Sequence, residues 1–319
     1  MLHVDRILCP FEPASDLGDR PAFAQGLYLA ERLDASIHVV PMAHRLRAST
    51  EPTGTMPPSH ADRAASARAL AAASGADVRI ASPSSELPST PTASGLLGYA
   101  EAAAIDFMVL DTPHDRGPIP PMASDPVRTL VERAEIPVFV AARSGRPVSF
   151  RRLLVPIDFS EHSRAALQHA KYLADLYGAS LDLLHVIERP QFVALNPTDM
   201  LAFSDATLTE RKTRRRIETF MEETNGVEVP ARLHLAHGDA ADQIMHFASE
   251  HPVDLVVLST HGVIGRPQHP LGNVADKVLR RVACPVVLTR AFGHSLLSSS
   301  SSDGSATQPA PSVDVPREE

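Results

Sequence analysis

A short stretch between residues 259 and 274 combines residue types that can hold an anion. Ser259-Thr260-His261-Gly262 follows the apolar run Leu255–Leu258, and Gly272-Asn273-Val274 opens a segment with helical spacing of apolar residues. A strand, a glycine-bearing loop and a helix in this order present backbone N–H groups and a helix N-terminus to a phosphate. Nine residues separate Gly262 from Gly272, and no lysine stands where a G-x-x-x-x-G-K-[ST] loop needs one. The stretch therefore predicts a phosphate site of a different type from that loop.

Two other strand ends in the same half of the chain carry candidate contact residues. Pro156-Ile157-Asp158 leaves a strand expected over 153–157, and Val186 ends the next one, expected over 180–186. Ligands of open α/β sheets bind beyond the carboxyl ends of strands, where the strand order reverses. The Asp158 carboxylate can accept hydrogen bonds from a ribose hydroxyl or an amine; alternatively, it caps the helix that follows Ser160. Three strand ends that converge on one crevice favour a binding site.

The glycine loop resembles that of the universal stress protein family, which reads Gly, two residues, Gly, nine residues, Gly and then Ser or Thr. Here Ser259 stands for the first Gly and Asn273 for the Ser or Thr, while Gly262 and Gly272 have the family's separation. Ser259 adds a side chain where the backbone must approach the ligand, whereas Asn273 loses a hydroxyl but keeps an amide donor. We expect these two departures to weaken the site without abolishing it.

The resemblance implies an adenine nucleotide ligand, ATP in the first place, with or without Mg²⁺. Pro156, Ile157 and Asp158 would border adenine and ribose, and Val186 would pack on the base. The nucleotide-binding residues that it implies are, in chain order, Pro156, Ile157, Asp158, Val186, Leu258, Ser259, His261, Gly262, Gly265, Gly272, Asn273 and Val274. Of these, Gly262, Gly272, Asn273 and Val274 would meet the phosphates.

The chain contains the same pattern twice. Arg6–Glu12 corresponds to Arg152–Asp158 at an offset of 146 residues, and Asp106–Leu110 corresponds to Asp254–Leu258 at an offset of 148. Both copies alternate strand and helix segments, and the strands are apolar runs, as in sheets covered by helices on both faces. We therefore expect an α/β fold of two tandem doubly wound domains, each with a five-stranded, mainly parallel sheet. The resemblance implies that this sheet is Rossmann-like, of the adenine nucleotide alpha hydrolase-like type.

The expected domain boundaries follow from the repeat and from a change in composition. The first domain spans 1–142 and the second 151–292, and a disordered tail rich in Ser, Pro and acidic residues spans 293–319. In the second copy we expect helices over 161–177, 205–224, 240–250 and 274–281. Ser160 is a predicted N-cap, and Gly178 is a predicted helix stop.

The first copy lacks the residues of the glycine loop. At an offset of 148, Asp111 replaces Ser259, His114 replaces Gly262, Ser124 replaces Gly272 and Asp125 replaces Asn273. Aspartates at these places would face a polyphosphate with like charge, and Ser124 or Asp125 reads as an ordinary N-cap before Pro126. Glu12 also replaces Asp158. We therefore expect nucleotide binding in the second copy only.

The last strand of each copy, over 137–141 and 285–289, is apolar and is expected at a sheet edge that needs cover. Homodimeric members of the family that the loop resembles pair through this strand. The covalent linkage of two copies favours the same contact within one chain. We therefore expect an intramolecular pseudo-dimer with Val138, Val140, Val286 and Leu288 at or near its interface.

Composition excludes several classes of partner. The chain of 319 residues has a net charge of −8, 5% aromatic residues and no Trp, which argues against nucleic acid. It shows neither a signal peptide nor an apolar run of the ~20 residues that span a bilayer, so we expect a cytoplasmic protein without a membrane partner. Two cysteines make no disulfide framework. Fifteen histidines occur without a metal-binding motif, and we expect them to be scattered over the surface.

The function expected from these observations is that of a stress-response protein that binds an adenine nucleotide in its second domain and regulates an unknown protein partner. We do not expect an efficient enzyme and assign no catalytic residue, since no general base is positioned for water attack on a phosphate. One alternative is a protein-interaction scaffold that binds no nucleotide. Another is an enzyme, a slow nucleotide hydrolase or a nucleotidyl transferase, in which Asp158 and His261 do acid–base work. Assembly of whole chains into a homo-oligomer remains open.

Overall fold

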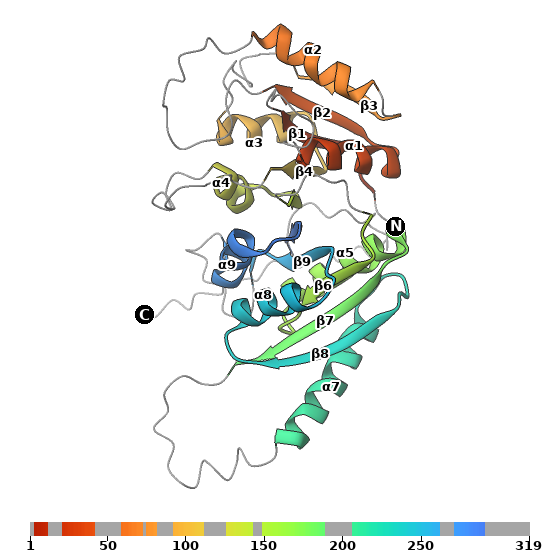
Figure 1. The fold of residues 1–319 in the computed structure, drawn as a ribbon, viewed down its shortest axis with the longest axis vertical. Coiled ribbons are helices and arrows are strands. Elements are labelled where there is room, and N and C mark those ends of the chain that lie inside the picture. The colour runs from red at the N-terminus through yellow and green to blue at the C-terminus, as the bar shows by residue number, and fades with distance from the viewer. Residues whose placement is uncertain are drawn as a thin grey trace, which may run out of the picture.

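The computed structural model describes residues 3–11, 21–41, 59–72, 75–81, 92–111, 126–142, 149–188, 206–261 and 271–290. The expected tail at 293–319 lies outside the described residues. In the first half the elements are β1 (Arg6–Phe11), α1 (Pro21–Leu33), β2 (Ser36–Pro41), α2 (His60–Ala71), β3 (Asp77–Ile80), α3 (Ala93–Ala102), β4 (Phe107–Leu110), α4 (Pro126–Arg133) and β5 (Val138–Val140) (Figure 1). In the second half they are β6 (Arg152–Pro156), α5 (Glu161–Tyr177), β7 (Ser180–Ile187), α7 (Ala206–Glu223), β8 (Ala231–His237), α8 (Ala240–Glu250), β9 (Leu255–Ser259), α9 (Asn273–Arg281) and β10 (Val286–Thr289).

All described strands belong to one ten-stranded sheet with the order β3-β2-β1-β4-β5-β10-β9-β6-β7-β8. Counted from its own first strand, each half has the order 3-2-1-4-5, and the pairings inside each half are parallel. The strand order reverses beside the first strand of each half, which is typical of a doubly wound fold. The expected α/β class with a mainly parallel sheet is confirmed.

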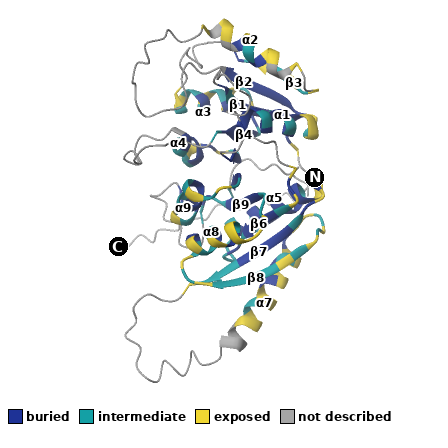
Figure 2. Cartoon of the chain, in the orientation of Figure 1, coloured by how far each residue is buried: buried dark blue, intermediate teal, exposed yellow. Residues whose placement is uncertain are grey.

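Helices cover both faces of the sheet, and the buried residues form one apolar cluster on each face (Figure 2). Residues of α1, α2, α5 and α7 pack into one cluster, and residues of α3, α4, α8 and α9 pack into the other. Because both faces of the inner strands are covered, β4 and β10 are buried at every position. Both clusters contain residues of both halves, so the core runs through the middle of the molecule without a break.

An aspartate just before β4 and another just before β9 make the same contact in the two halves. Asp106 Oδ2 accepts hydrogen bonds from the backbone N–H groups of Asp5 and Arg6 at 2.9 and 3.0 Å. Asp254 Oδ2 accepts from those of Arg151 and Arg152 at 2.8 and 3.0 Å. Each carboxylate therefore ties the start of the fourth strand of its half to the start of the first. The two copies of the sequence pattern therefore also share this hydrogen-bonding contact.

The two halves meet through their last strands, as predicted. Strand β10 pairs with β5 in antiparallel orientation, with Val287 opposite Phe139. These two residues are 148 positions apart and are equivalent in the repeat, so a pseudo-twofold axis passes between them. On the α1/α5 side, Tyr28 stacks on Tyr177 with ring centroids 6.1 Å apart. The expectation that Val138, Val140, Val286 and Leu288 lie at this interface is confirmed.

On the other side of the junction, equivalent positions of α4 and α9 carry opposite charges. Arg128 Nη1 lies 3.7 Å from Asp276 Oδ1, and these residues are also 148 positions apart. Within each helix the same charges pair at i,i+4, Arg128 with Glu132 and Asp276 with Arg280. Two identical copies would place like charges opposite each other here. The charges therefore favour pairing of the first half with the second over pairing of either half with itself.

We expect a coupling free energy of about 0.5–1 kcal/mol between Arg128 and Asp276, the scale of a partly exposed ion pair. The measurement is a double-mutant cycle with Arg128→Gln, Asp276→Asn and both changes together, followed by urea unfolding. Neutral replacements leave the partners Glu132 and Arg280 in place without adding a like charge. Strictly additive losses of stability would show that the two helices do not recognise each other through this pair.

Some histidines are not surface residues, which corrects the expectation from sequence. His38 is 7% exposed and His169 is 2% exposed. His234 Nε2 hydrogen-bonds Asp182 Oδ1, a buried carboxylate, at 2.8 Å. Each of these histidines has an apolar neighbour in its strand or helix, and no sequence motif indicated that it is buried.

Within the described part of the chain, no group of three His, Cys, Asp or Glu side chains could hold a metal ion. None of the described helices is long and apolar enough to cross a bilayer.

Candidate functional site

The predicted site residues gather at the carboxyl ends of β6, β7 and β9 and at the start of α9. Strand β6 lies between β7 and β9 in the sheet. The chain leaves β6 toward α5 on one face and leaves β9 toward α9 on the other. This is the point of the second half where strand order reverses, and such a point leaves a crevice for a ligand. Gly262 and Gly265 lie outside the described residues.

Just after β6, Asp158 contacts Ser160, which is the N-cap of α5, so the predicted cap role belongs to Ser160. Asp158 Oδ1 accepts from the backbone N–H of Ser160 at 3.0 Å and from Ser160 Oγ at 2.5 Å. Ser160 Oγ in turn accepts from the Ser163 N–H at 3.1 Å and caps α5. Contact of Asp158 with a ligand remains a prediction. Ile157 is 4% exposed, and its N–H donates to the Leu184 carbonyl, so this backbone is held rigidly.

The residue after Asp158 was not predicted to belong to the site. Phe159 has a φ of +64°, in the left-handed region that residues with a Cβ rarely adopt. Its ring centroid lies 4.6 Å from that of His185, and the Arg216 guanidinium lies 3.9 Å from it. Such a conformation persists only where the surroundings hold it, and these are frequently functional places. A single aromatic residue after Pro-Ile-Asp gave no signal that could have found it.

His185 lies near the end of β7, beside Phe159. Its Nδ1–H donates to the Ile157 carbonyl at 2.8 Å. Burial lowers the pKa of His185, and the hydrogen bond to Ile157 opposes this shift. The imidazole is therefore neutral at pH 7 and presents Nε2 as an acceptor. Val186, the predicted base contact, follows on the same strand and is half-buried.

The end of β9 is held close to the start of α9 by backbone contacts. The Gly272 N–H donates to the Thr260 carbonyl at 2.7 Å. A Cβ on Gly272 would lie only 3.0 Å from that carbonyl oxygen, closer than side chains normally approach. The φ and ψ of Gly272 are −63° and 148°, which any residue can adopt, so the requirement for glycine comes from this close approach. Ser259 Oγ donates to the His261 carbonyl, and Thr260 Oγ1 lies 3.0 Å from His261 Nδ1.

Helix α9 begins without a side-chain cap. Gly272 is its N-cap and makes no side-chain hydrogen bond. By contrast, Ser59, Thr92, Ser160 and Asp239 cap α2, α3, α5 and α8 with a side-chain oxygen. The first N–H groups of a helix need an acceptor from outside the helix, and a phosphate is a suitable one. Asn273 and Val274, the first two residues of α9, carry N–H groups of this kind.

In the first half, a carboxylate of the chain itself contacts a helix N-terminus. Asp111, which stands where Ser259 stands in the second half, accepts a hydrogen bond from the Ala22 N–H at 2.9 Å through Oδ1. Ala22 is the second residue of α1, so the negative charge lies at the positive end of that helix. His114, Ser124 and Asp125 lie outside the described residues, as does Glu12.

A protein-family comparison matches the second half of the chain, which contains this site. The sequence model described as "Universal stress protein family" matches residues 149–290. These residues form a universal stress protein domain. The resemblance noted in the sequence is confirmed. Over 143 residues the chain is 27% identical to universal stress protein MJ0531 of Methanocaldococcus jannaschii, which spans 44% of this chain and 82% of that protein. Over 147 residues it is 29% identical to universal stress protein YxiE of Bacillus subtilis, spanning 44% of this chain and 99% of the relative.

Solved structures share the fold of most of the chain, beyond the universal stress protein domain. A functionally unknown protein, PA1789 of Pseudomonas aeruginosa, superposes with a TM-score of 0.64 at 17% identity, covering 89% of this chain and 92% of that one. A putative universal stress protein of the same species superposes with a TM-score of 0.61 at 18% identity, with the same coverage. At such identities the likeness concerns the fold only. The two-half architecture therefore recurs in proteins of low sequence identity to this chain.

Proposed function

We propose that the second half of the chain binds ATP or another adenine nucleotide and that the protein acts as a regulatory module in the stress response. The observation that carries the proposal is the start of α9, which has no side-chain cap and is held against the end of β9 at Gly272, where a Cβ would crowd the Thr260 carbonyl. A helix N-terminus beside a glycine turn at a reversal of strand order attracts phosphate. Nucleotide binding in the universal stress protein family adds to this expectation.

The roles of the residues follow from their places around the crevice. Asn273 and Val274 bind the phosphates through backbone N–H groups. Gly272 brings the start of α9 close to the end of β9, and Gly262 and Gly265 belong to the same loop. Asp158 and the backbone of Pro156 and Ile157 border the adenosine, with Val186 packing on the base. Mg²⁺, if bound, would offset the negative charge of the phosphates. The first half binds no nucleotide, because Asp111 already supplies a carboxylate at the end of β4.

We propose binding without efficient turnover. The two candidates for acid–base work are both engaged by neighbouring groups. Asp158 Oδ1 accepts two hydrogen bonds from Ser160, one from its backbone N–H and one from its Oγ. His261 Nδ1 lies 3.0 Å from Thr260 Oγ1. A regulatory protein that keeps its nucleotide bound does not need rapid hydrolysis.

The test is to denature the purified full-length chain and to identify the released small molecules by mass spectrometry. We expect an adenine nucleotide at up to one per chain, and calorimetry of the emptied protein with ATP should give one site. If no nucleotide is released and ATP produces no heat of binding, the proposal fails. The alternative of a scaffold that binds no nucleotide then stands.

Asn273→Ser should tighten ATP binding. The serine hydroxyl restores a donor at the first residue of α9, and a hydrogen bond is worth about 0.5–1.5 kcal/mol, so Kd should fall roughly two- to tenfold. Asn273 is exposed, so the fold should tolerate the change. Asn273→Ala is the matched control and should weaken binding if the amide donates to phosphate. Equal affinities for all three proteins would show that the side chain at this position does not reach the ligand.

A further inference from the structure

Phe159 adopts a backbone conformation that its place in the chain does not explain. Its φ of +64° lies in the left-handed region. Among the other described residues that carry a side chain, Asp34 and Ala104 share this region, and both come just after a helix, where a left-handed residue commonly ends it. Phe159 instead comes between β6 and α5. A Cβ makes this conformation costly, so contacts with other elements must hold it.

The Phe159 ring is held by residues of two other elements. Its centroid lies 4.6 Å from that of His185 on β7 and 5.6 Å from that of Phe220 on α7. The Arg216 guanidinium of α7 lies 3.9 Å from the centre of the Phe159 ring, within the range of a cation–π contact. Arg216 and Phe220 are four residues apart and so lie on one face of α7. The strained residue therefore depends on the position of this helix.

Phe159 also lies inside the turn that orients Asp158. Asp158 Oδ1 accepts from the N–H of Ser160 at 3.0 Å, two residues further on, which closes an Asx turn around Phe159. Ser160 is in turn the N-cap of α5. On the other side of the turn, His185 Nδ1–H donates to the Ile157 carbonyl at 2.8 Å. The side chain that contacts Phe159 from β7 therefore also fixes the backbone just before the turn.

Arg216 lies within electrostatic reach of the same strand ends. Burial lowers the pKa of His185, and the hydrogen bond to Ile157 opposes this shift. The positive charge of Arg216 lowers this pKa further, and the negative charge of Asp158 raises it. Both charges therefore act on one imidazole. Since Asp158 and Ile157 are proposed to border the adenosine, α7 brings a positive charge near the proposed adenosine contacts.

Helix α7 is anchored to the rest of its domain through its second half. Ile217 and Phe220 are buried, whereas every residue from 210 to 216 is partly or fully exposed. Figure 1 shows the helix beginning away from the strands and approaching them along its length. Its first half contacts β8 from Arg214 and Glu210, at 3.4 Å in both cases and at exposed places. Exposed contacts of this kind are weak, so the position of α7 depends on its second half, where Phe159 packs.

We propose that Phe159 is a positioning residue that couples the nucleotide site to α7; this inference rests on the proposed function. With α7 in place, Arg216 and Phe220 hold the ring, and the strained backbone keeps Asp158 turned toward the start of α5. When α7 moves away, the ring loses both contacts and the backbone relaxes. A nucleotide that binds at Asp158 selects the first state and so stabilises α7. By thermodynamic linkage, the contacts of α7 raise the affinity for the nucleotide.

Calorimetry with ATP on full-length variants tests the coupling. Arg216→Gln removes the cation from the Phe159 ring, and we expect Kd to rise roughly two- to fivefold, the scale of an exposed cation–π contact. Arg215→Gln is the matched control, because it removes the same charge from an exposed neighbour, and it should leave Kd unchanged. Phe159→Gly adopts the left-handed backbone without strain and has no ring. In that background Arg216→Gln should have no further effect.

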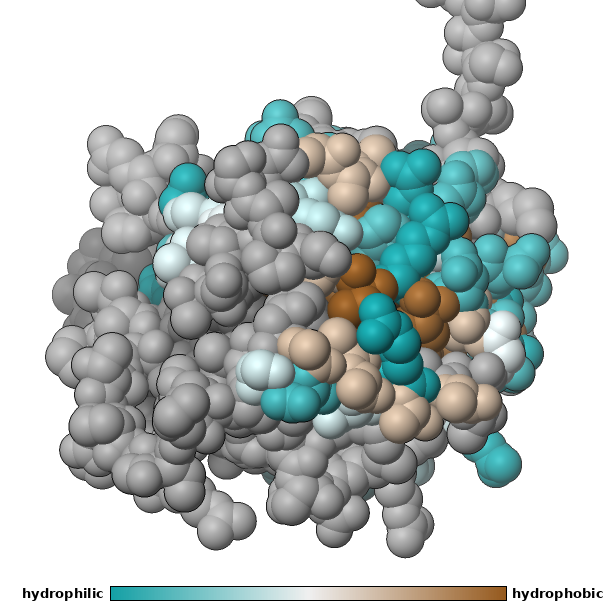
Figure 3. Space-filling view, turned by 90° about the horizontal axis from the view of Figure 1, so that it is seen from above, coloured by the Kyte–Doolittle hydropathy of each residue, from teal (hydrophilic) through white to brown (hydrophobic). Residues whose placement is uncertain are grey.

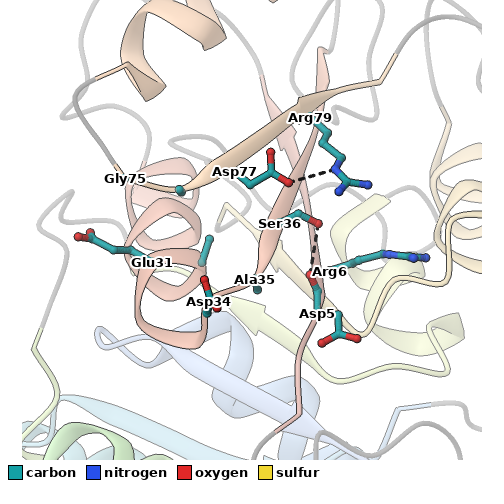
Figure 4. Close-up of a pocket in the computed structure, with 11 residues that line it drawn as sticks. Asp5, Arg6, Glu31, Asp34, Ala35, Ser36, Gly75, Asp77 and Arg79 are labelled. Carbon is teal, nitrogen blue, oxygen red and sulfur yellow. Dashed lines mark hydrogen bonds and ion pairs between the residues drawn. The ribbon is translucent and has the colours of Figure 1, made fainter.

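A second control lies at the far end of the molecule. Arg79 is on the edge strand β3, at the end that Figure 3 views, where hydrophilic residues lie beside hydrophobic ones. It contacts Asp77 at 3.2 Å beside a hollow of about 510 Å³ that Asp5, Glu31 and Asp34 also line (Figure 4). Carboxylates outnumber guanidinium groups in this hollow, which makes it unfavourable for a polyphosphate. Arg79→Gln should therefore change neither ATP affinity nor the exchange of α7.

Hydrogen exchange measured by NMR separates this inference from the nucleotide proposal. ATP should slow the exchange of the α7 amides in the wild type but not in Phe159→Gly. Without nucleotide, Arg216→Gln should speed exchange of the Ser160 amide, which donates to Asp158, and Arg215→Gln should not. This comparison tests the coupling even in a protein that binds no ATP. Unchanged Ser160 exchange in Arg216→Gln, or the same effect of Arg216→Gln on Kd with and without the Phe159 ring, overturns the inference. ATP binding by the wild type would then leave the proposed function standing.

Discussion

Gly272→Val is expected to abolish ATP binding while leaving most of the fold intact. A Cβ at this position would lie 3.0 Å from the Thr260 carbonyl oxygen, and the added methyl groups of valine need more room still. Relief of this overlap moves the end of β9 away from the start of α9. The hydrogen bond of 2.7 Å from the Gly272 N–H to Thr260 is then lost. Because the phosphates are proposed to bind at this joint, we expect Kd to rise beyond the range that calorimetry detects.

The controls for this prediction are a smaller side chain and the equivalent position in the first half. Gly272→Ala adds the Cβ alone and should weaken binding by an intermediate amount. Ser124→Val, 148 positions earlier, should leave the affinity nearly unchanged, because nucleotide binding is proposed for the second half only. Circular dichroism should show the same helix content in all three variants. Two equal ATP sites per chain in the wild type would contradict the proposed asymmetry.

Val287→Lys is expected to weaken the junction between the two halves more than any other single change discussed above. Val287 is 1% exposed and lies opposite Phe139 at the centre of the β5–β10 pair. Its apolar cluster also contains Phe150 and Tyr177, and an ammonium group placed there would lack a buried counter-ion. An uncompensated buried charge costs about 3–5 kcal/mol, so the midpoint of urea unfolding should fall clearly.

Hydrogen exchange distinguishes loosening of the junction from general destabilisation. In Val287→Lys, the amides of β5 and β10 should exchange first, while those of β1 and β6 stay protected for longer. Val287→Ala removes volume without adding charge and should cause a smaller loss of stability. Val140→Lys, on the opposite face of the same strand pair, should act as Val287→Lys does. Uniformly faster exchange across the whole sheet would show that the halves do not open at their junction.

Local signals in the sequence accounted for the helices of the second half. The helices predicted over 161–177 and 240–250 begin and end at those residues in the structure. Ser160 caps the first of them, and Gly178 ends it with a φ of +62°. These boundaries depend on hydrogen bonds within a few residues of the chain, so the sequence alone can specify them. The duplication was visible for the same reason, since both copies carry the same local pattern.

The set of strand ends around the candidate site could also be predicted, because parallel strands necessarily bring their carboxyl ends to one edge. The role of a single residue at that edge could not. Asp158 was predicted to contact a ligand or to cap a helix, and the structure shows it hydrogen-bonded to Ser160, which is the N-cap. Phe159 joined the site through contacts with His185 and Arg216, which lie on other elements. Such contacts depend on how β7 and α7 pack, and a local pattern contains no information about that.

The amino-acid sequence thus determined the α/β class, the twofold repeat, the apolar final strands and the glycine loop, all of which follow from patterns of neighbouring residues. Tertiary structure alone decided which charges meet. Asp182 is a buried carboxylate in a mostly apolar strand, and its partners Arg152 and His234 are 30 and 52 positions away. Arg128 meets Asp276 only because the antiparallel junction places equivalent positions face to face. Electrostatic energy depends on distance in space and on burial, and folding creates both.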